Sequence, residues 1–449
     1  MVVHGLNMVY KVAPYYPAAS GFDGDDAAFL GELGFNVVRV GVIWKALEPG
    51  PGVYNDRYLR HVADTVRTLA AHGIFSLLEF HQDMYSELFQ GEGAPDWAVQ
   101  GDGLANPKNG FAANDVTNPA LQRAEDNFWA NSPGPGGVGL QNRFAAAWRH
   151  VAEMFRDIPG VLGYELWNEP TAGAQFATCL GPYGCPAFDA QVTAFDRRVA
   201  SAIRKVDSQT LIFYEPDIGF DFGVATHVHA LRHRQAGFAF HVYCMGGWPD
   251  GCPSQPQVIA NALDHVANTH EALLMTEWGS SQYPGDLTAM MNLADRYMVP
   301  WIEWAYCSCS DPTGATGDPL VLNPAVPPVG ANVGQLALHI LVEPYPQLIA
   351  GTPRSWGYNG QTKRFQLRYS TARADRSGWF GSGTITQIAT PRLIYRRPYA
   401  VHVHGGTIVS PRGASVLEIA ACPGAREVSV QVLPGGRRRE SCRRPKATG

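Results

Sequence analysis

Eight short apolar segments, most of them separated by helical patterns, constrain the fold of this 449-residue chain more than any other feature. The helical patterns are clearest at residues 56–72, 140–155 and 188–206, where apolar residues recur every three or four positions. Strands that alternate with helices form parallel sheets, and eight of them suit a closed (β/α)8 TIM barrel. An open doubly wound sheet is the alternative, but polar residues at the ends of many strands favour closure. The predicted strands are residues 2–8, 37–44, 74–83, 161–169, 210–215, 238–243, 273–278 and 299–306.

The pattern changes near residue 350, where short β-type runs replace the alternation of strands and helices. Turn residues separate these runs, which is typical of a small antiparallel β-sandwich. We therefore predict a catalytic barrel over residues 1–350 and a C-terminal β-sandwich over residues 351–449. The basic tail, residues 437–444, is expected to be a solvated, mobile terminus, with attraction to an anionic lipid surface as the alternative. The predicted strands are residues 364–369, 384–388, 393–395, 400–404, 416–420 and 428–433.

Charge and cysteine content narrow the class of protein. A net charge of −5 and a pI near 6.3 argue against a nucleic-acid partner. No apolar stretch approaches the roughly 18 residues that span a bilayer. Six of the eight cysteines form close pairs (179 with 185, 244 with 252, 307 with 309), while Cys422 and Cys442 lie near the C-terminus. Local disulfides predict secretion, with free buried thiols as the alternative. No signal peptide precedes the first strand, so we expect that the natural chain starts further upstream.

Two strands far apart in the sequence end on a glutamate. The first ends in Asn168-Glu169-Pro170 and the second in Glu277-Trp278-Gly279. In a (β/α)8 barrel the C-terminal ends of all strands meet at one face, so these two carboxylates are predicted to form one site. Polar groups gather at the other strand ends too, and burying them without partners would cost about 1–3 kcal/mol each. These further residues are Asn7, Lys11, Arg39, His81, Asp83, His241, Tyr243 and Trp304.

The strand-end motifs resemble those of glycoside hydrolase family five. The broad resemblance rests on Asn168-Glu169-Pro170, on Glu277 within Thr-Glu-Trp-Gly, on Arg39 and on His241-Val242-Tyr243. The chain is more specifically similar to the endoglycoceramidase branch of that family, and the similarity covers nearly its whole length. The motifs for that branch are His4-Gly5-Leu6-Asn7, His81-Gln82-Asp83-Met84-Tyr85-Ser86, Asp126-Asn127-Phe128-Trp129, Pro344-Tyr345-Pro346 and Gly351-Thr352-Pro353.

The resemblance implies a retaining glycosidase with a role for each strand-end residue. Glu169 is expected to be the acid/base, its pKa raised by burial and by the neighbouring negative charge, and Glu277 the nucleophile. Arg39 and Tyr243 would keep Glu277 ionised, and Asn168 would bind the sugar 2-hydroxyl. Trp304 would form the apolar platform under the reacting sugar. The remaining predicted substrate-binding residues are Lys11, His81, Asp83, Trp129 and His241.

Other titratable residues have simpler structural interpretations. Glu165 lies two and four positions before Trp167 and Glu169 and is expected to form a buried ion pair, and Glu79 is likewise predicted to be structural. Glu303 adjoins Trp304 and is left out of the site. Two further histidine pairs, 227 with 229 and 402 with 404, lack a third ligand and are not predicted to bind metal.

The long segment 82–139 after the third strand is predicted to shape the binding site. A ceramide leaving group needs an apolar groove beside the sugar site. Apolar loop residues could line such a groove or could pack on one another. The candidates are Met84, Tyr85, Leu88, Phe89, Phe111, Phe128, Trp129, Phe220, Phe222 and Trp248.

Together these observations predict a secreted, retaining endo-glycosidase that cuts the β-glycosidic bond between an oligosaccharide and ceramide in glycosphingolipids. It would use water as acceptor and need no metal or cofactor. We expect a monomer that approaches a membrane or micelle surface peripherally, with no nucleic-acid partner. The alternative activity is that of another family-five β-glycosidase, acting on a β-glucan or a simple glucoside such as a steryl glucoside. A non-catalytic carbohydrate- or lipid-binding protein is disfavoured because both Glu169 and Glu277 are present.

Overall fold

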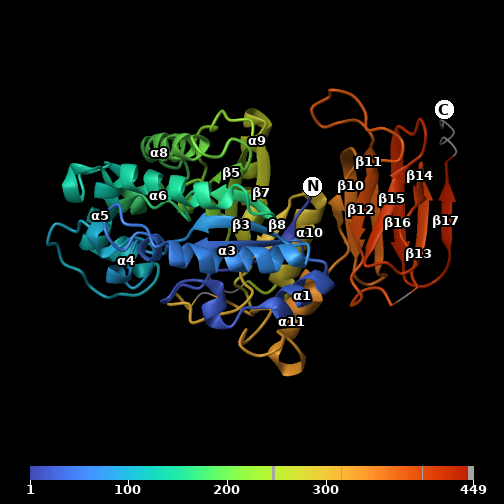
Figure 1. Cartoon of the computed structure of the whole chain (residues 1–449), viewed down its shortest axis with the longest axis horizontal. Coiled ribbons are helices and arrows are strands. Elements are labelled where there is room, and N and C mark those ends of the chain that lie inside the picture. The colour runs from blue at the N-terminus through green and yellow to red at the C-terminus, as the bar shows by residue number, and fades with distance from the viewer. Residues whose placement is uncertain (245–247, 315, 397, 443–449) are drawn as a thin grey trace.

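The computed structural model describes residues 1–244, 248–314, 316–396 and 398–442. Eight parallel strands form a closed barrel in sequence order, with each strand paired to the next and β8 paired back to β1, as predicted (Figure 1). The strands are β1 (His4–Met8), β2 (Val37–Val42), β3 (Phe75–Phe80), β4 (Val161–Glu165), β5 (Leu211–Tyr214), β6 (Ala236–Val242), β7 (Ala272–Trp278) and β8 (Trp301–Glu303).

Helices cover the outside of the barrel, and the three predicted ones lie within two residues of their expected bounds. The first of these begins where the Asn55 side chain accepts a hydrogen bond from the Tyr58 N–H, and it buries one apolar face against the barrel. The helices are α1 (Gly24–Leu33), α2 (Trp44–Leu47), α3 (Asp56–Ala71), α4 (Ala113–Thr117), α5 (Pro119–Trp129), α6 (Leu140–Phe155), α7 (Phe176–Cys179), α8 (Pro186–Arg204), α9 (Gln255–Thr269), α10 (Pro284–Tyr297) and α11 (Gln335–Leu341).

A layer of apolar side chains, one from each strand or the residue beside it, fills the barrel near the N-terminal ends of its strands. This layer excludes water from the base of the barrel, so the polar residues that follow in the same strands are left at the opposite end. Its members are Val3, Val37, Leu77, Leu162, Phe213, Ala239, Leu274 and Ile302.

A nine-stranded, mainly antiparallel sheet follows the barrel, in the order β10-β11-β16-β13-β17-β14-β15-β12-β9. Alternate residues of its two halves, among them Leu367, Val401 and Ile419, are buried in one core, which gives the predicted sandwich. The predicted boundary at residue 350 falls between two strands of this sheet. The strands are β9 (Pro346–Leu348), β10 (Thr352–Asn359), β11 (Arg364–Ser370), β12 (Ile385–Ala389), β13 (Ala400–His404), β14 (Gly406–Ile408), β15 (Val416–Ala421), β16 (Glu427–Leu433) and β17 (Arg438–Ser441).

Two sequence predictions for this region are wrong. Residues 393–395 form a turn rather than a strand, because the N–H groups of Ile394 and Tyr395 both donate to the Pro391 carbonyl. Much of the basic tail is not a mobile end, since β17 pairs with β13 in parallel and with β14. The Cys422–Cys442 disulfide ties its end to the residue that follows β15. Arg443 and Arg444 lie outside the described residues.

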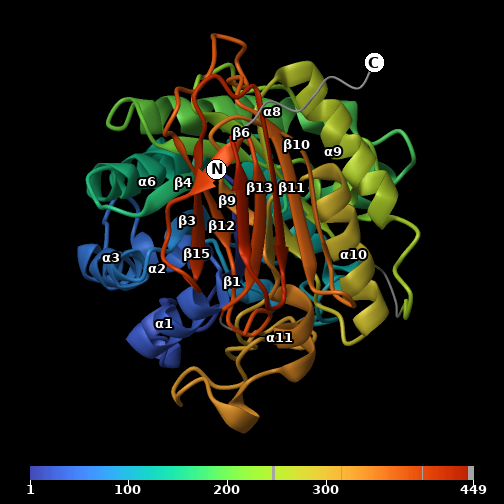
Figure 2. The same cartoon turned by 90° about the vertical axis from the view of Figure 1, so that its right-hand side faces the viewer.

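The sheet packs against the base of the barrel. The Val2 N–H donates to the Gln347 carbonyl at 3.0 Å, and the Tyr345 hydroxyl donates to the Gly34 carbonyl at 2.9 Å. Both barrel residues precede the N-terminal ends of strands. Figure 1 shows the sheet at one end of the molecule, with α4 and α5 at the far end, and Figure 2 shows the sheet in front of the barrel. The sheet therefore lies opposite the mouth that the C-terminal strand ends form.

The four disulfides join Cys179 to Cys185, Cys244 to Cys252, Cys307 to Cys309 and Cys422 to Cys442. The three predicted close pairs are thus confirmed in the structure. Among the helices that the structure describes, none has the length and apolar character needed to cross a membrane.

Candidate active site

The guanidinium of Arg39, fully buried on β2, is the centre of a polar network at the mouth of the barrel. Its Nε atom lies 2.7 Å from Glu165 Oε2, and one of its Nη atoms donates to Glu277. The other Nη atom donates to Asn168 Oδ1 at 2.9 Å and to Glu215 Oε1 at 3.3 Å. The prediction that Glu165 forms a buried ion pair is confirmed. Because the guanidinium is planar and carries several donors, it can orient residues of three different strands at once.

The Glu277 carboxylate lies at the end of β7 and receives charged and neutral donors. Its second oxygen, Oε2, accepts the Tyr243 hydroxyl at 2.7 Å and lies 3.6 Å from His241 Nδ1. Burial is the largest single influence and would raise the pKa of Glu277, but the charges of His241, Arg39 and His81 together with the Tyr243 hydrogen bond outweigh it. The net shift is downward. A carboxylate that stays ionised while buried is suited to nucleophilic attack.

The Glu169 carboxyl follows β4 and is held by a strained backbone. Its φ of +44° lies in the left-handed region, a conformation that costs a non-glycine residue about 1–3 kcal/mol. The Glu169 N–H donates to Glu215 Oε2 at 3.1 Å, and Gln82 Nε2 donates to the carbonyls of Asn168 and Glu169. On the side chain, His241 Nδ1 lies 2.9 Å from Oε1. These contacts aim the carboxyl into the mouth rather than along the strand.

The two glutamates lie close together. One carboxylate oxygen of Glu169 and one of Glu277 are within 4.8 Å of each other, and His241 contacts both residues. A retaining glycosidase has its two carboxyl groups about 5–5.5 Å apart, whereas an inverting one leaves room for a water molecule at about 6.5–9.5 Å. The spacing is that of the retaining class.

A second polar cluster lies beside the glutamates and joins the loops after β1 and β3. Lys11 Nζ lies 2.5 Å from Asp83 Oδ2, 3.2 Å from Asp311 Oδ2 and 4.3 Å from the centre of the Trp304 ring. The His81 ring stacks on Trp304 at 5.4 Å. These side chains present a cation, a carboxylate and an indole face to one space, which is the set of groups that binds a sugar ring.

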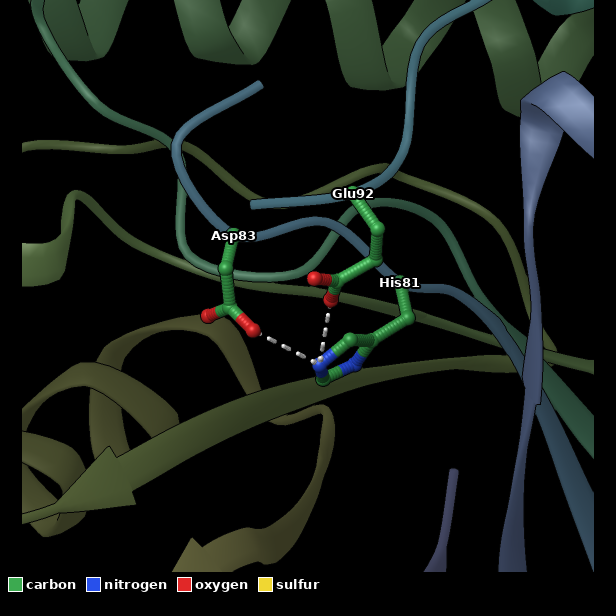
Figure 3. Close-up of side chains that lie close together, drawn as sticks. All are labelled: His81, Asp83 and Glu92. Atoms are coloured by element: carbon green, nitrogen blue, oxygen red, sulfur yellow. Dashed lines mark ion pairs between the residues drawn. The ribbon is translucent and has the colours of Figure 1, made fainter. Parts of the chain in front are cut away.

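Glu92 and Asp83 both point toward the same nitrogen of the His81 ring (Figure 3). His81 Nε2 lies 3.6 Å from Asp83 Oδ2 and 3.7 Å from Glu92 Oε1. Burial is the largest single influence on His81 and lowers its pKa, but Glu79 and Asp83 together raise that pKa to about 10. Burial and the Asp83 charge raise the pKa of Glu92, while Lys11 holds that of Asp83 low. The cluster is thus a positively charged His81 and Lys11 around an ionised Asp83, with Glu92 protonated.

A cavity of about 510 Å³ unites both clusters. One side carries Lys11, His81, Asp83 and Trp304. The segments after β5, β6 and β7 add the aromatic and apolar side chains Ile218, Phe222, Tyr243 and Tyr283, next to the polar residues Ser280, Ser281, Gln282 and Asp286, and the loop after β3 adds Phe111. The cavity therefore has a charged part at Lys11 and Asp83 and a part richer in aromatic side chains, and both glutamates line it.

Three groups of buried side chains bring three possible metal-ligand atoms within 4.8 Å of one another in the part of the chain that the structure describes. In the first group, the Lys11 ammonium already lies against Asp83 and supplies the positive charge that a cation would bring. In the other two, Arg39 does the same for Glu165, Glu215 and Glu277. The groups are His81, Asp83, Glu92; Glu165, Glu215, His241; and Glu169, His241, Glu277.

All but one of the residues predicted for the site meet at this mouth; the exception is Trp129. Its indole N–H donates to the Thr171 carbonyl at 2.8 Å, and its ring packs edge-on against Phe188 and Phe195. The side chain is 7% exposed and does not line the cavity. The end of α5 turns it into the packing between α5 and α8, so the structure does not bring Trp129 to the site.

Most of the predicted groove residues also pack inside the protein. Of the ten candidates, Phe111 and Phe222 line the cavity, whereas Leu88 and Trp248 are exposed elsewhere. The segment 82–139 covers its own apolar residues with α4, α5 and short 3-10 turns. The buried candidates are Met84, Tyr85, Phe89, Phe128, Trp129 and Phe220.

Three buried acidic residues of the site were not predicted from the sequence. Glu215 follows β5 and contacts Arg39, His241 and the Glu169 backbone. The sequence does contain a pattern that could have located Glu215, because Glu215-Pro216 repeats the Glu-Pro pair of Glu169-Pro170 at a strand end. Asp221 lies 3.9 Å from His241 Nδ1, and burial and the Glu169 charge raise its pKa. Neither Asp221 nor Glu92 stands at a strand end, so no pattern marked them.

This fold and site define a glycoside hydrolase, and the chain belongs to glycoside hydrolase family 5. Residues 14–310 match the model of the cellulase domain of that family, and residues 344–432 match its C-terminal domain. The expected family resemblance is therefore confirmed, and the protein is an enzyme that hydrolyses glycosidic bonds.

Within the family, the chain is similar to endoglycoceramidases over almost its whole length. It is 29% identical to endoglycoceramidase I of Rhodococcus hoagii, covering 96% of this chain and 85% of that protein. Endo-glycoceramidase II from Rhodococcus sp. superposes with a TM-score of 0.77 at 27% identity, covering 97% of this chain and 98% of the other. The same enzyme has been solved as a lactosyl-enzyme intermediate, with 26% identity, a TM-score of 0.78 and the same coverage. It has also been solved in a ganglioside GM3 complex, with 25% identity, a TM-score of 0.76 and coverage of 97% of each chain.

Proposed function

We propose that this enzyme releases an intact oligosaccharide from ceramide by hydrolysing the β-glycosidic bond of a glycosphingolipid. The observation that carries the proposal is the lining of the cavity, which combines the sugar-binding groups Lys11, His81, Asp83 and Trp304 with an apolar wall of Ile218, Phe222, Tyr243 and Tyr283. A glycolipid has the same combination, a sugar and an apolar chain, on the two sides of its scissile bond. The Rhodococcus enzyme that binds ganglioside GM3 supports the assignment.

In the first step, Glu277 attacks the anomeric carbon while Glu169 transfers its proton to the ceramide oxygen. The bond between the anomeric carbon and that oxygen breaks, and a covalent glycosyl-enzyme forms. Arg39 and Tyr243 keep Glu277 ionised for this attack. The lactosyl-enzyme intermediate of the Rhodococcus relative corresponds to this stage.

In the second step, Glu169 accepts a proton from water, and the resulting hydroxide displaces Glu277 from the sugar. His241 orients Glu169 through the contact at Oε1. Asn168, whose side-chain carbonyl accepts from Arg39, presents its amide to the sugar 2-hydroxyl. The Trp304 ring supports the sugar, and Lys11, His81 and Asp83 bind its hydroxyl groups.

The alternative is a family-five β-glycosidase that acts on a β-glucan or a steryl glucoside. A short match to an ergosteryl-β-glucosidase of Saccharomyces cerevisiae, 34% identical over 90 residues, keeps the steryl glucoside in view. The apolar wall would accept a sterol as well as an acyl chain. Its aromatic and aliphatic side chains fit a lipid leaving group better than the hydroxyl-rich surface of a glucan.

The decisive experiment incubates the enzyme with a glycosphingolipid in detergent micelles, and in parallel with a soluble β-glucan and a steryl glucoside. We expect free oligosaccharide and ceramide by mass spectrometry. Glu277→Ser should abolish release and keep glycolipid binding. The matched control is Glu343→Gln, a buried glutamate between α11 and β9, which should retain turnover. Turnover of the glucan or the steryl glucoside with the glycosphingolipid left intact would overturn the proposal.

We further propose that the enzyme is secreted and acts as a monomer at the surface of a membrane or micelle. Four disulfides support the first point, since such bonds persist in oxidising compartments. Secretion is tested by following the full-length protein in culture supernatant, and the oligomeric state by light scattering.

A further inference from the structure

A second, larger cavity of about 940 Å³ lies on the rim of the barrel beside the catalytic one. It is enclosed by the loops that follow β1, β2 and β3, and by the start of α3. None of its lining residues belongs to the catalytic cavity. Its lining includes two aromatic and four charged side chains, namely Tyr16, Trp97, Lys45, Arg57, Glu87 and Asp96.

The two cavities are built from successive parts of the same two loops. The loop after β1 contributes Lys11 to the catalytic cavity and Tyr16 to the rim cavity. The loop after β3 contributes Asp83 to the first, and Glu87 and Trp97 to the second. The Tyr15 hydroxyl, which donates to Glu87, joins the two loops at the rim cavity. In both loops, the segment that lines the rim cavity thus follows shortly after the residue, Lys11 or Asp83, that lines the catalytic cavity.

The aromatic groups of the rim cavity are held by the protein and stay partly exposed. The Trp97 indole N–H donates to the Glu48 carbonyl at 2.9 Å, and its ring meets Trp44 at 5.4 Å with an angle of 82°. Tyr16 stacks on His61 at 4.3 Å, with only 11° between the ring planes. Rigid aromatic faces bind the apolar faces of sugar rings with little loss of side-chain entropy.

The polar groups are arranged around these rings. Lys45 Nζ lies 2.6 Å from Glu87 Oε2 and 2.8 Å from Asp96 Oδ1, so both carboxylates are held in place with acceptor positions left over. The Arg57 side chain is exposed and makes no ion pair among the described residues. Carboxylates and a guanidinium beside aromatic rings are suited to sugar hydroxyls.

The direction of the substrate follows from the chemistry of the site. Glu169 protonates the leaving group, so the ceramide lies on the side of Glu169 and the apolar wall. The oligosaccharide must then extend in the opposite direction, past Lys11 and Asp83. We propose that the rim cavity binds the outer sugars of this oligosaccharide, those beyond the two nearest to ceramide. The inference rests on the proposed function and adds a preference for longer glycans.

The test compares kcat/KM on lactosylceramide with kcat/KM on a glycosphingolipid that has four sugars. We expect Trp97→Ala to lower kcat/KM on the longer substrate by about tenfold, chiefly through KM, and to leave lactosylceramide unaffected. Arg57→Ala, which removes an exposed side chain, should act in the same direction and does not depend on packing. The control is Trp379→Ala in the C-terminal sheet, an exposed tryptophan far from both cavities, which should change neither value.

A binding measurement keeps this test independent of turnover. Titration calorimetry of the wild-type enzyme with the free, ceramide-less tetrasaccharide should give a signal that Trp97→Ala and Arg57→Ala both weaken. If the enzyme hydrolyses neither glycolipid, that result contradicts only the proposed function. Hydrolysis of both, with the ratio of kcat/KM and the binding of the tetrasaccharide unchanged in both variants, would overturn the rim cavity's role.

Discussion

At the scale of single residues, the site depends on placing four acidic groups around one arginine without leaving their charges uncompensated. Arg39 contacts Glu165, Glu215 and Glu277, and lies 3.6 Å from Glu79. One cation cannot balance all of them, so burial raises the pKa of Glu215 well above its usual range. Glu277, whose pKa is lowered, keeps its negative charge, which nucleophilic attack requires.

The hydrogen bond from Tyr243 to Glu277 gives the first prediction. It stabilises the ionised carboxylate, so Tyr243→Phe should raise the pKa of Glu277 in the free enzyme. The acidic limb of the pH profile of kcat/KM should therefore move to higher pH. At the optimum, kcat/KM should fall about tenfold, from the loss of roughly 1.5 kcal/mol of transition-state stabilisation. A fall in kcat/KM with an unshifted acidic limb would show that the hydroxyl acts on the substrate instead.

Trp129 gives a second prediction, because its burial away from the cavity separates stability from catalysis. Trp129→Phe removes the hydrogen bond to the Thr171 carbonyl and part of the packing against Phe188. We expect the free energy of unfolding to fall by about 1–3 kcal/mol in a denaturant titration, with KM for the glycolipid unchanged within about twofold. A raised KM in a variant of unchanged stability would restore the sugar-binding role that the sequence suggested.

At the scale of elements, the sequence located the barrel strands because each is a short apolar run with a polar residue at its end. The strand ends in turn located Glu169, Glu277 and Arg39, since barrel geometry makes them converge whatever their sequence separation. Loop-borne residues such as Glu92 and Asp221 gave no such signal, because their positions depend on how a long segment folds on itself. The same reason accounts for Trp129, where a family motif predicted contact but the end of α5 directs the ring into a helix interface.

The pairing of β1 with β2 gives the third prediction. A Cβ atom added at Gly5 would lie 1.9 Å from the Val37 carbonyl oxygen, closer than any real contact. Gly5→Ala should therefore push the two strands apart and lower the free energy of unfolding by about 1–3 kcal/mol or more. The matched control is Gly24→Ala at the start of α1, where nothing lies within 4 Å of the added atom. Thermal unfolding of both variants should show a large loss for the first and little change for the second; equal curves would contradict the close approach.

At the scale of the whole molecule, the two domains are joined through Asp295 near the end of α10. Its Oδ1 accepts the Trp356 indole N–H at 2.9 Å, and its Oδ2 accepts the Tyr358 N–H at 3.0 Å. Burial raises the pKa of Asp295 to about 6, because these two hydrogen bonds offset only part of the cost of desolvation. The contact between the barrel and the sheet therefore responds to pH.

The sign of this response gives the fourth prediction. The folded state binds the Asp295 proton more tightly than the unfolded chain does, so the free energy of unfolding that this group contributes falls as pH rises from about 4 to about 6. The total loss is about 3 kcal/mol for a shift of this size. Asp295→Asn lacks the titration, so denaturant unfolding of wild type and variant between pH 4 and pH 7 should give curves that diverge by that amount. Parallel curves would contradict the raised pKa of Asp295.

Because the sheet lies at the base of the barrel, the point at which the enzyme is attached to a support decides which way the mouth of the barrel faces. A chain attached to a solid support through engineered lysines on the outer strands of the sheet would hold the mouth of the barrel toward the solution. Attachment through the loops after β3 would turn the mouth against the support. The two couplings would give the same amount of bound protein, and only the first would leave micelles free to reach the catalytic cavity.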